Sequence, residues 1–382
     1  MMAVIPLRNL LSLVQKRLIA TSAALSPQPP LPPSSVEYLM KSCGLSFESA
    51  VAISLKSQSD EKKARKQALV INCLKSYGFN DTQIVKLAEK RSTILQCNIR
   101  RTLKPKLEFL VESGLTGKHL AKLIVTNPTV LSKSLDFYLK PMMKFLRQYL
   151  KTHDAIVIAL HRASRLLSYD LNGFLQPNIQ FLIDQGVSPD GISKLLVVQP
   201  MALLHRPERI VYLARTVKEE MGLLPKSSNF IDGFRVLSSM SDATRKKKIK
   251  LFKSFGWSED DIFRTFRKQP NFIAYSEEKV RSQMDFLLNT VKVEPKIIVS
   301  YPKILSFSVD KRLRPRYEVL KVLLSKKLIR GDTKILWLLT TSEKLFLQRY
   351  VTRYLDKVPG LLDMYNGSVN QSRNPRPGKI DD

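Results

Sequence analysis

The stretch from Leu103 to Leu146 reads LKPKLEFLVESGLTGKHLAKLIVTNPTVLSKSLDFYLKPMMKFL, and its end repeats its beginning. The proline near its start, Pro105, recurs as Pro141 and Pro177 at intervals of 36 residues. The same interval separates several apolar columns, among them Leu110, Leu146 and Leu182; Leu120, Ile156 and Ile192; and Leu131, Leu167 and Leu203. A fixed period between about 20 and 50 residues is the signature of a repeat array.

Each repeat unit can be converted into structure. Pro105 suits the first turn of a helix, where its missing N–H would be unbonded anyway. Gly114 suits the end of that helix, and Thr116 can cap a second helix that stops before Pro128. Leu131 then belongs to a short apolar segment with room for one further turn. Neither helix can bury its apolar stripe alone, so the sequence predicts an all-α fold, an α-solenoid of about eight stacked repeats.

Composition restricts the class of partner. The chain has 382 residues, 63 of them basic and 33 acidic, for a net charge of +30 and a pI of about 10. Such a surface attracts polyanions, meaning nucleic acid or an anionic membrane, although the charge could also serve solubility alone. The three cysteines, Cys43, Cys73 and Cys97, fit neither a disulfide framework nor a zinc site, and we expect them to be reduced.

The N-terminal segment has the character of a targeting signal. Residues 1–26 contain basic but no acidic side chains, since the first acid is Glu37, and their leucines fall at helical spacing. We interpret the segment as an organelle transit peptide, with mitochondrion favoured over chloroplast. No stretch approaches the roughly 18–20 apolar residues of a membrane span, so no membrane partner is expected.

The rest of the chain divides by pattern. We expect a Pro-rich linker over 27–35, a capping half-repeat over 36–66, helical repeats over 67–342, one capping helix over 343–365 and a disordered tail over 366–382. The register runs through most of the chain, with a degenerate fifth repeat and a two-residue offset in the sixth, which favours one array over separate globular domains. Ser164 and Val236 stand where other units have proline, so the kink is in doubt there.

A recurring phrase points to a known family. Residues 127–132 read NPTVLS and residues 301–306 read YPKILS, and the latter are followed by a basic Leu-x-Pro start at 313–316. This ordered set resembles the mitochondrial transcription termination factor (mTERF) family, plant type. The resemblance implies a superhelix of paired α-helices with short 3₁₀ turns. It also implies an organellar, nucleic-acid-binding function in transcription termination, initiation or RNA processing, without a catalytic centre.

Two sets of basic residues could form the binding surface. Lys86, Lys122, Lys194 and Arg264 recur two residues after a buried column and fit phosphate contacts and solvated helix faces equally well. A second set, the junction set, clusters where units meet, near predicted helix N-termini. There positive charge opposes the macrodipole, so its recurrence favours a phosphate track. The junction set comprises Arg100, Arg101, Lys104, Lys133, Lys140, Arg162, Arg165, Arg206, Arg209, Lys279, Arg281, Lys311, Arg312, Arg314 and Arg316.

Catalysis finds no support in the sequence. The four histidines lack metal-ligand spacing, and there is no Gly-rich phosphate loop, so we expect no enzyme, metal or cofactor. Aromatic residues such as Phe109 and Phe145 lie at apolar columns and are interpreted as core. The first hypothesis is a monomeric regulator that binds double-stranded DNA. The alternatives are an RNA-binding factor in splicing or transcript maturation and a protein-interaction scaffold. The Arg245–Lys248 run is interpreted as a solvated helix start.

Overall fold

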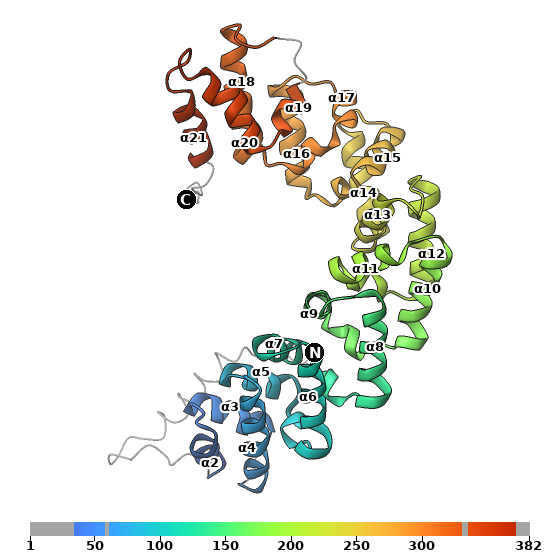
Figure 1. Cartoon of the computed structure of the whole chain (residues 1–382), viewed down its shortest axis with the longest axis vertical. Helices are drawn as coiled ribbons and strands as arrows, with labels where there is room; N and C mark the ends of the chain where they lie inside the picture. The colour runs from blue at the N-terminus through green and yellow to red at the C-terminus, as the bar shows by residue number, and fades with distance from the viewer. Residues whose placement is uncertain (1–33, 58–60, 331–334, 372–382) are drawn as a thin grey trace, which may run out of the picture. The chain divides into compact units, whose positions relative to one another are not determined.

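The computed structural model describes residues 34–57, 61–330 and 335–371. Throughout these ranges the chain forms helices and turns, with no strand, which confirms the predicted all-α helical-repeat fold (Figure 1). The expected transit segment and most of the expected linker lie outside the described residues. The last two linker residues, Ser34 and Ser35, belong to the first described helix.

The chain divides into two compact units between Lys144 and Phe145, within α8 (Lys140–Tyr149). The sequence indicated one array, whereas the structure has two units that are built from the same repeat. The first unit contains α2 (Ser34–Cys43), α3 (Phe47–Ser57), α4 (Glu61–Ser76), α5 (Asp81–Arg91), η1 (Ser92–Gln96), η2 (Ile99–Leu103), α6 (Lys104–Glu112), α7 (Gly117–Thr126), η3 (Pro128–Ser132) and η4 (Leu135–Leu139).

The second unit continues the same alternation of long and short helices. Its elements are α9 (His153–Arg162), η5 (Ser164–Ser168), η6 (Leu171–Leu175), α10 (Gln176–Asp184), α11 (Pro189–Val198), η7 (Pro200–Leu203), α12 (Pro207–Arg215), η8 (Thr216–Glu220), α13 (Ser228–Ser238), α14 (Asp242–Lys253), α15 (Glu259–Lys268), η9 (Pro270–Ala274), α16 (Glu277–Asp285), η10 (Phe286–Thr290), α17 (Pro295–Ser300), η11 (Pro302–Ser306), η12 (Val309–Leu313), α18 (Arg314–Ser325), α19 (Ile335–Thr340), α20 (Glu343–Phe346), η13 (Leu347–Val351), η14 (Thr352–Tyr354) and α21 (Leu361–Gln371).

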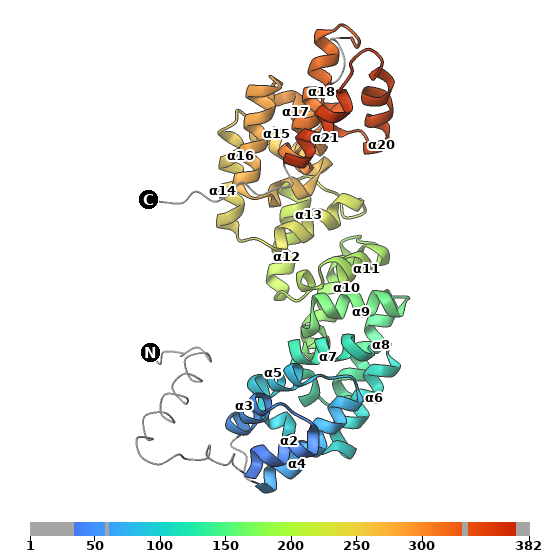
Figure 2. The same ribbon diagram turned by 90° about the vertical axis from the view of Figure 1, so that its left-hand side faces the viewer.

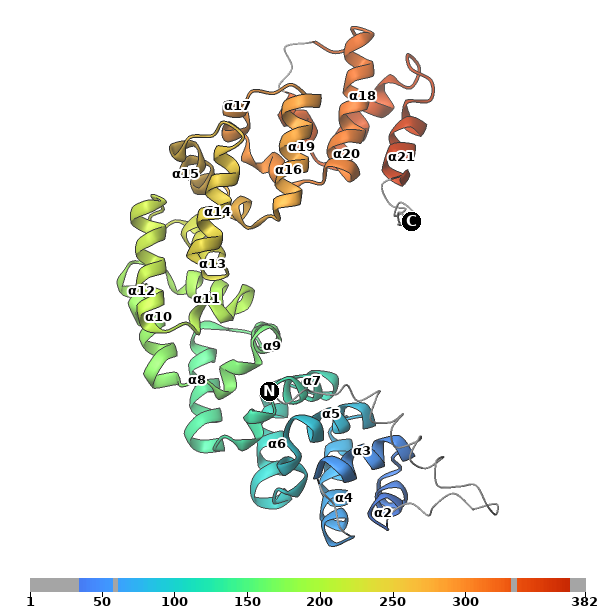
Figure 3. The same cartoon turned by 180° about the vertical axis from the view of Figure 1, so that it is seen from behind.

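Stacking of like helices builds each unit. In the first unit α2 packs on α4, and α3 packs on α5, which in turn packs on α7 (Figure 2). In the second unit α9, α11 and α13 form one row, and α10 packs on α12 in the other (Figure 3). Because each helix buries its stripe against the equivalent helix of the next repeat, the core is a continuous layer between the two rows.

The repeat that begins with α6 shows how sequence sets the local structure. Pro105 lies in the first turn of α6, and Gly114 ends the helix with a φ of +92° that favours glycine. The backbone of Asn127, at φ −132° and ψ 80°, breaks α7 before Pro128. The 3₁₀ helix η3 then carries Val130 and Leu131 into the core. The π-helical segment η2 before α6 has no counterpart in the sequence prediction.

The two units without proline behave differently. Ser164 begins the 3₁₀ helix η5, because Ala163 adopts φ −144° and ψ 78°, close to the values of Gln199 before Pro200. The kink is therefore kept without proline. Val236, in contrast, lies inside α13, which continues to Ser238, so this repeat has no 3₁₀ turn.

Two expectations at the C-terminal end are wrong. The single capping helix predicted over 343–365 is broken into α20, η13, η14 and α21, and Gly360 precedes α21 with a φ of +82°. The predicted disordered tail begins too early, since α21 continues through residues 366–371. Residues 372–382 lie outside the described residues.

Five polar side chains connect the first helix of a repeat to the end of the same repeat by hydrogen bonds, and we call them the donor column. Its members lie on the first helix of a repeat and donate to backbone carbonyls in or just after the short segment that ends that repeat. Asn178 Nδ2 donates to Leu203 O at 2.9 Å, and Gln283 Nε2 donates to Leu305 O at 2.7 Å. The column comprises Lys106, Asn178, Lys248, Gln283 and Arg316.

The substitution Gln283→Met tests the donor column. Methionine keeps the length of glutamine but leaves the carbonyls of Leu305 and Phe307 without this donor. We expect the free energy of unfolding to fall by about 1–3 kcal/mol, the cost of an unsatisfied buried group. Urea unfolding followed by circular dichroism measures the change. The exposed Gln348→Met provides the control, and equal stability of both variants would contradict the assignment.

Candidate nucleic-acid interface

Five members of the junction set are exposed and form no ion pair with an acid in the described part of the chain. Arg100 and Arg101 lie in η2 of the first unit. In the second unit Arg165 lies in η5, Arg206 is the residue before α12, and Lys311 lies in η12. These side chains carry positive charge that no described carboxylate neutralises, which suits them to bind a polyanion.

Five other members pair with carboxylates. Four of them bridge one helical turn, and all lie at the surface or near it. Such pairs stabilise by about 0.3–0.5 kcal/mol and leave the cations reachable for an anion. The pairs are Lys104–Glu108 at 3.6 Å, Lys140–Asp136 at 2.7 Å, Arg281–Glu277 at 2.7 Å, Arg314–Asp310 at 3.6 Å and Arg209–Asp242 at 3.4 Å.

Arg162 does not lie at a helix N-terminus as the sequence indicated. It is the last residue of α9, and its guanidinium donates to Val197 O and Val198 O at 2.8 Å, at the C-terminal end of α11 in the next repeat. Lys90 does the same for Val125 O at 2.7 Å. A cation at a helix C-terminus is favourable, so these side chains cap the neighbouring repeat.

Three junction residues that form no ion pair with an acid in the described ranges lie against aromatic rings, whereas Arg209, Arg314 and Arg316 combine a ring contact with a carboxylate. The ammonium of Lys133 is 4.4 Å from the ring centre of Tyr138, and that of Lys279 is 3.9 Å from Tyr275. Lys279 also donates to Ser306 O at 3.2 Å, and burial lowers its pKa because the charged form loses hydration. The third, Arg312, lies 4.0 Å from the Phe307 ring and donates to the carbonyl of Thr341, as part of the packing between η12 and α19.

Arg316 was predicted to lie on the binding surface, and this prediction is wrong, because the side chain is fully buried. It is the donor-column member of its repeat, with Leu339 O at 3.1 Å and Thr341 O at 2.6 Å. Its guanidinium also pairs with Glu343 at 2.5 Å, and Tyr365 donates to the same carboxylate at 2.6 Å. Burial, together with this hydrogen bond, raises the pKa of Tyr365 to about 12. The charge of Arg316 therefore serves the fold.

The substitution Arg316→Met separates these two roles. Methionine fills part of the volume but leaves the Leu339 carbonyl without its side-chain donor, the Thr341 carbonyl with Arg312 as its remaining donor, and Glu343 without its ion-pair partner. We expect a loss of about 3–5 kcal/mol in the free energy of unfolding, as for a broken buried pair. The salt dependence of nucleic-acid binding should not change. Salt titration and urea unfolding measure the two effects. A lower salt slope at unchanged stability would contradict this assignment and show that Arg316 contacts the nucleic acid.

The first set of basic residues is exposed as predicted, but it is not uniform. Lys86 and Lys122 are exposed and form no ion pair with an acid in the described ranges. Lys194 pairs with Asp232 at 2.9 Å, and Arg264 pairs with Asp260. The chemistry of the set thus stays compatible with both interpretations.

The Arg245–Lys248 run is only partly solvated. Arg245 is buried, pairs with Glu220 at 2.7 Å and donates to the hydroxyl of Tyr212 at 3.1 Å. Lys248 belongs to the donor column through the carbonyl of Tyr275. The interpretation as a solvated helix start was therefore wrong for these two residues.

The sequence analysis missed two exposed aromatic rings in η4 of the first unit. Phe137 is 84% exposed and Tyr138 is 43% exposed, beside Lys133. The hydroxyl of Ser134 accepts from the backbone N–H of Phe137 at 3.2 Å and fixes the start of the segment. Register was the available signal, since Phe137 lies 36 residues after Arg101 and therefore outside the apolar columns.

Other kinds of site have less basis in the described residues. No cluster of three histidine, cysteine or acidic side chains there is arranged to hold a metal ion. Within the same ranges no helix has both the length and the apolar character that a membrane crossing requires.

Comparison with known proteins agrees with these features. Residues 71–161 and 137–347 match the protein family described as mTERF. A 176-residue stretch is 25% identical to "Transcription termination factor MTERF15, mitochondrial" of Arabidopsis thaliana, and it covers 44% of this chain and 37% of that protein. A 134-residue stretch is 23% identical to "Transcription termination factor MTERF8, chloroplastic" of the same organism, at 35% and 26% coverage. The chain thus matches less than half the length of these relatives.

Proposed function

We propose that this chain, which belongs to the mTERF family, is a non-catalytic organellar protein that binds nucleic acid and regulates organelle gene expression. Both relatives are named transcription termination factors, one mitochondrial and one chloroplastic. The basic, acid-free segment at residues 1–26 favours the mitochondrion, with the chloroplast as the alternative. Transcription termination or a related step of transcription is the process we assign.

Double-stranded DNA is the ligand we propose first. The observation that carries it is the recurrence of exposed cations without a described acidic partner at several repeat junctions, namely Arg100, Arg101, Arg165, Arg206 and Lys311. Exposed cations at several repeat junctions suit the repeated phosphates of a nucleic acid backbone. Phosphate contacts fix register and orientation but carry no sequence information, so the proposal concerns the backbone and not a target sequence.

Salt titration of the full chain tests the electrostatic mechanism. We expect the logarithm of duplex affinity to fall linearly with that of salt concentration, by about 0.9 per phosphate neutralised. The variants Arg165→Ala and Arg206→Ala should each lower that slope by about 1, at unchanged urea stability. Fluorescence anisotropy with duplex DNA, single-stranded DNA and RNA of the same sequence provides the measurement.

The matched control is Arg281→Ala, since Arg281 already pairs with Glu277 and should change the slope less. An affinity that does not depend on salt concentration would contradict the phosphate-contact mechanism. If none of the three polymers binds at about 50–100 mM salt, a protein-interaction scaffold becomes the better account.

Single-stranded RNA is the second candidate, and the exposed rings of η4 favour it. A base can stack on an aromatic face only if it is not paired, and such stacking is worth about 1–3 kcal/mol per base. Phe137 is mostly free of its own protein, and Lys133 beside Tyr138 could hold the adjoining phosphate. This chemistry would place the protein in splicing or transcript maturation.

The substitution Phe137→Ala distinguishes the two ligands. If RNA stacks on this ring, its affinity should fall about 5- to 150-fold, which corresponds to the stacking energy above. Duplex affinity should stay the same, because paired bases cannot reach the ring. The exposed Leu69→Ala in the same unit controls for loss of apolar surface. An equal effect on duplex and RNA would refute base stacking.

A further inference from the structure

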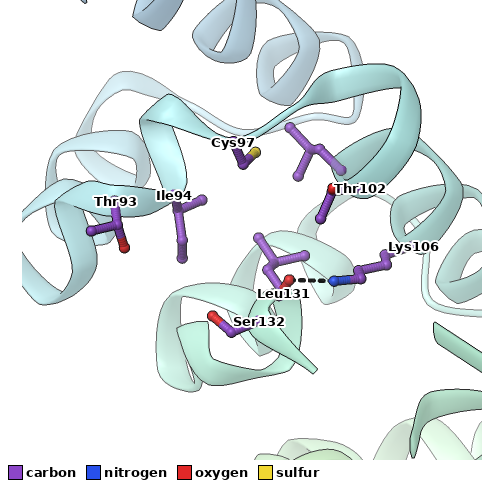
Figure 4. A pocket seen from close by; sticks show the side chains of 8 residues that line it. Thr93, Ile94, Cys97, Thr102, Lys106, Leu131 and Ser132 are labelled. Carbon is purple, nitrogen blue, oxygen red and sulfur yellow. Dashed lines mark hydrogen bonds between the residues drawn. The ribbon is translucent and has the colours of Figure 1, made fainter. Parts of the chain in front are cut away.

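A cavity of about 170 Å³ lies in the first unit, where η1, η2, α6 and η3 come together (Figure 4). It is far larger than the roughly 10–15 Å³ that one water molecule needs. Its lining combines apolar side chains with a thiol, three hydroxyls and one ammonium. The lining residues are Thr93, Ile94, Cys97, Thr102, Leu103, Lys106, Leu131 and Ser132.

The ammonium belongs to Lys106, the donor-column member of this repeat. Its Nζ donates to Leu131 O at 2.6 Å, the dashed contact in Figure 4. Asn178 and Gln283, at the same place in other repeats, each donate to two carbonyls of their turns. An ammonium has three N–H donors, so Lys106 can donate further hydrogen bonds besides the one to the Leu131 carbonyl.

The charge of Lys106 is also unbalanced. The residue is only 7% exposed, and no described acidic side chain forms an ion pair with it. Burial lowers its pKa, because the charged form loses hydration, and the interaction with Cys97 offsets this loss only in part. Buried charges in proteins are ordinarily paired, so an anion beside this ammonium would supply the counter-charge that no described acidic side chain provides.

The other polar groups fit an anion with several oxygens. Thr93 and Ser132 are exposed while Lys106 is buried, so the cavity leads from hydroxyls at the surface to a cation at its base. Hydroxyls and an ammonium are all donors to phosphate oxygens. Two basic residues, Arg101 and Lys133, directly precede Thr102 and follow Ser132 in the sequence.

We propose that this cavity binds a phosphate group, with Lys106 as the cation that holds it and Thr93, Thr102 and Ser132 as hydroxyl donors. Its cation, Lys106, is not one of the exposed junction cations, and binding of inorganic phosphate can be measured without a polymer. The phosphate could be free, or it could be the terminal phosphate of a nucleic acid strand. Either source would offer the same tetrahedral group of oxygens to the ammonium.

The repeats themselves supply the variants for the test. Met142 and Asn178 stand at the position of Lys106 in the next two repeats, so Lys106→Met and Lys106→Asn are replacements that this fold already accommodates. Isothermal titration of the full chain with inorganic phosphate, in a chloride buffer free of other oxyanions, should show saturable binding. Both variants should bind at least tenfold more weakly. Lys122→Met, at an exposed lysine of the same unit, should bind like the original chain.

Competition identifies the source of the phosphate. If a 5′-phosphorylated oligonucleotide displaces the bound inorganic phosphate and the same oligonucleotide with a 5′-hydroxyl does not, the site binds strand ends. If neither oligonucleotide displaces it, the site binds free phosphate. Binding should weaken as pH rises through the lowered pKa of Lys106, because the neutral amine loses its charge.

The proposal is overturned if inorganic phosphate shows no saturable binding, or if the folded Lys106 variants bind it unchanged. An equal loss in Lys122→Met would show general charge attraction instead. These outcomes are independent of polymer binding, which is measured separately through Arg165 and Arg206.

Discussion

The constraint on which the repeat depends is that backbone carbonyls buried at its end need hydrogen-bond donors. The short turn after the second helix inserts its leucines, such as Leu131 and Leu203, into the core, and backbone carbonyls follow them inward. A buried acceptor without a partner costs about 1–3 kcal/mol. The donor column meets this need from the first helix of the same repeat. In the five repeats that have such a residue, it joins the first helix to the segment that ends the repeat, which apolar packing alone does not specify.

The same constraint divides the basic residues by role. Lys106 and Arg316 use their charge inside the protein, and Lys90 and Arg162 use theirs to cap the next repeat. Such cations are held by carbonyls and contribute less to the outer field than a formal charge of +30 suggests. What remains for a polyanion is the exposed subset at the junctions. A basic sequence therefore indicates a polyanion partner only after the structural cations have been removed from the count.

The sequence predicted whatever depends on periodicity. A 36-residue register with proline and glycine at fixed places was enough for paired helices, their turns and the 3₁₀ segment. It could not place Arg316, because a basic residue after a proline looks alike whether its partner is a phosphate or a carbonyl distant in the sequence. Phe137 was missed although the 36-residue register pairs it with Arg101 and so places it outside the apolar columns. The failure at Arg316 concerns a tertiary contact that local pattern does not encode.

The repeat from Leu139 to Asp170 departs from its neighbours at three points of this scheme. Met142 replaces the donor, Leu150 stands where Gly114 ends the first helix of the preceding repeat, and Ser164 replaces the proline. The division between the two compact units falls within the first helix of this same repeat, between Lys144 and Phe145. Apolar packing still builds the repeat, but the bond between its first helix and its turn lacks a side-chain donor at Met142. The chain thus divides within a repeat whose first helix has no donor-column bond to its turn.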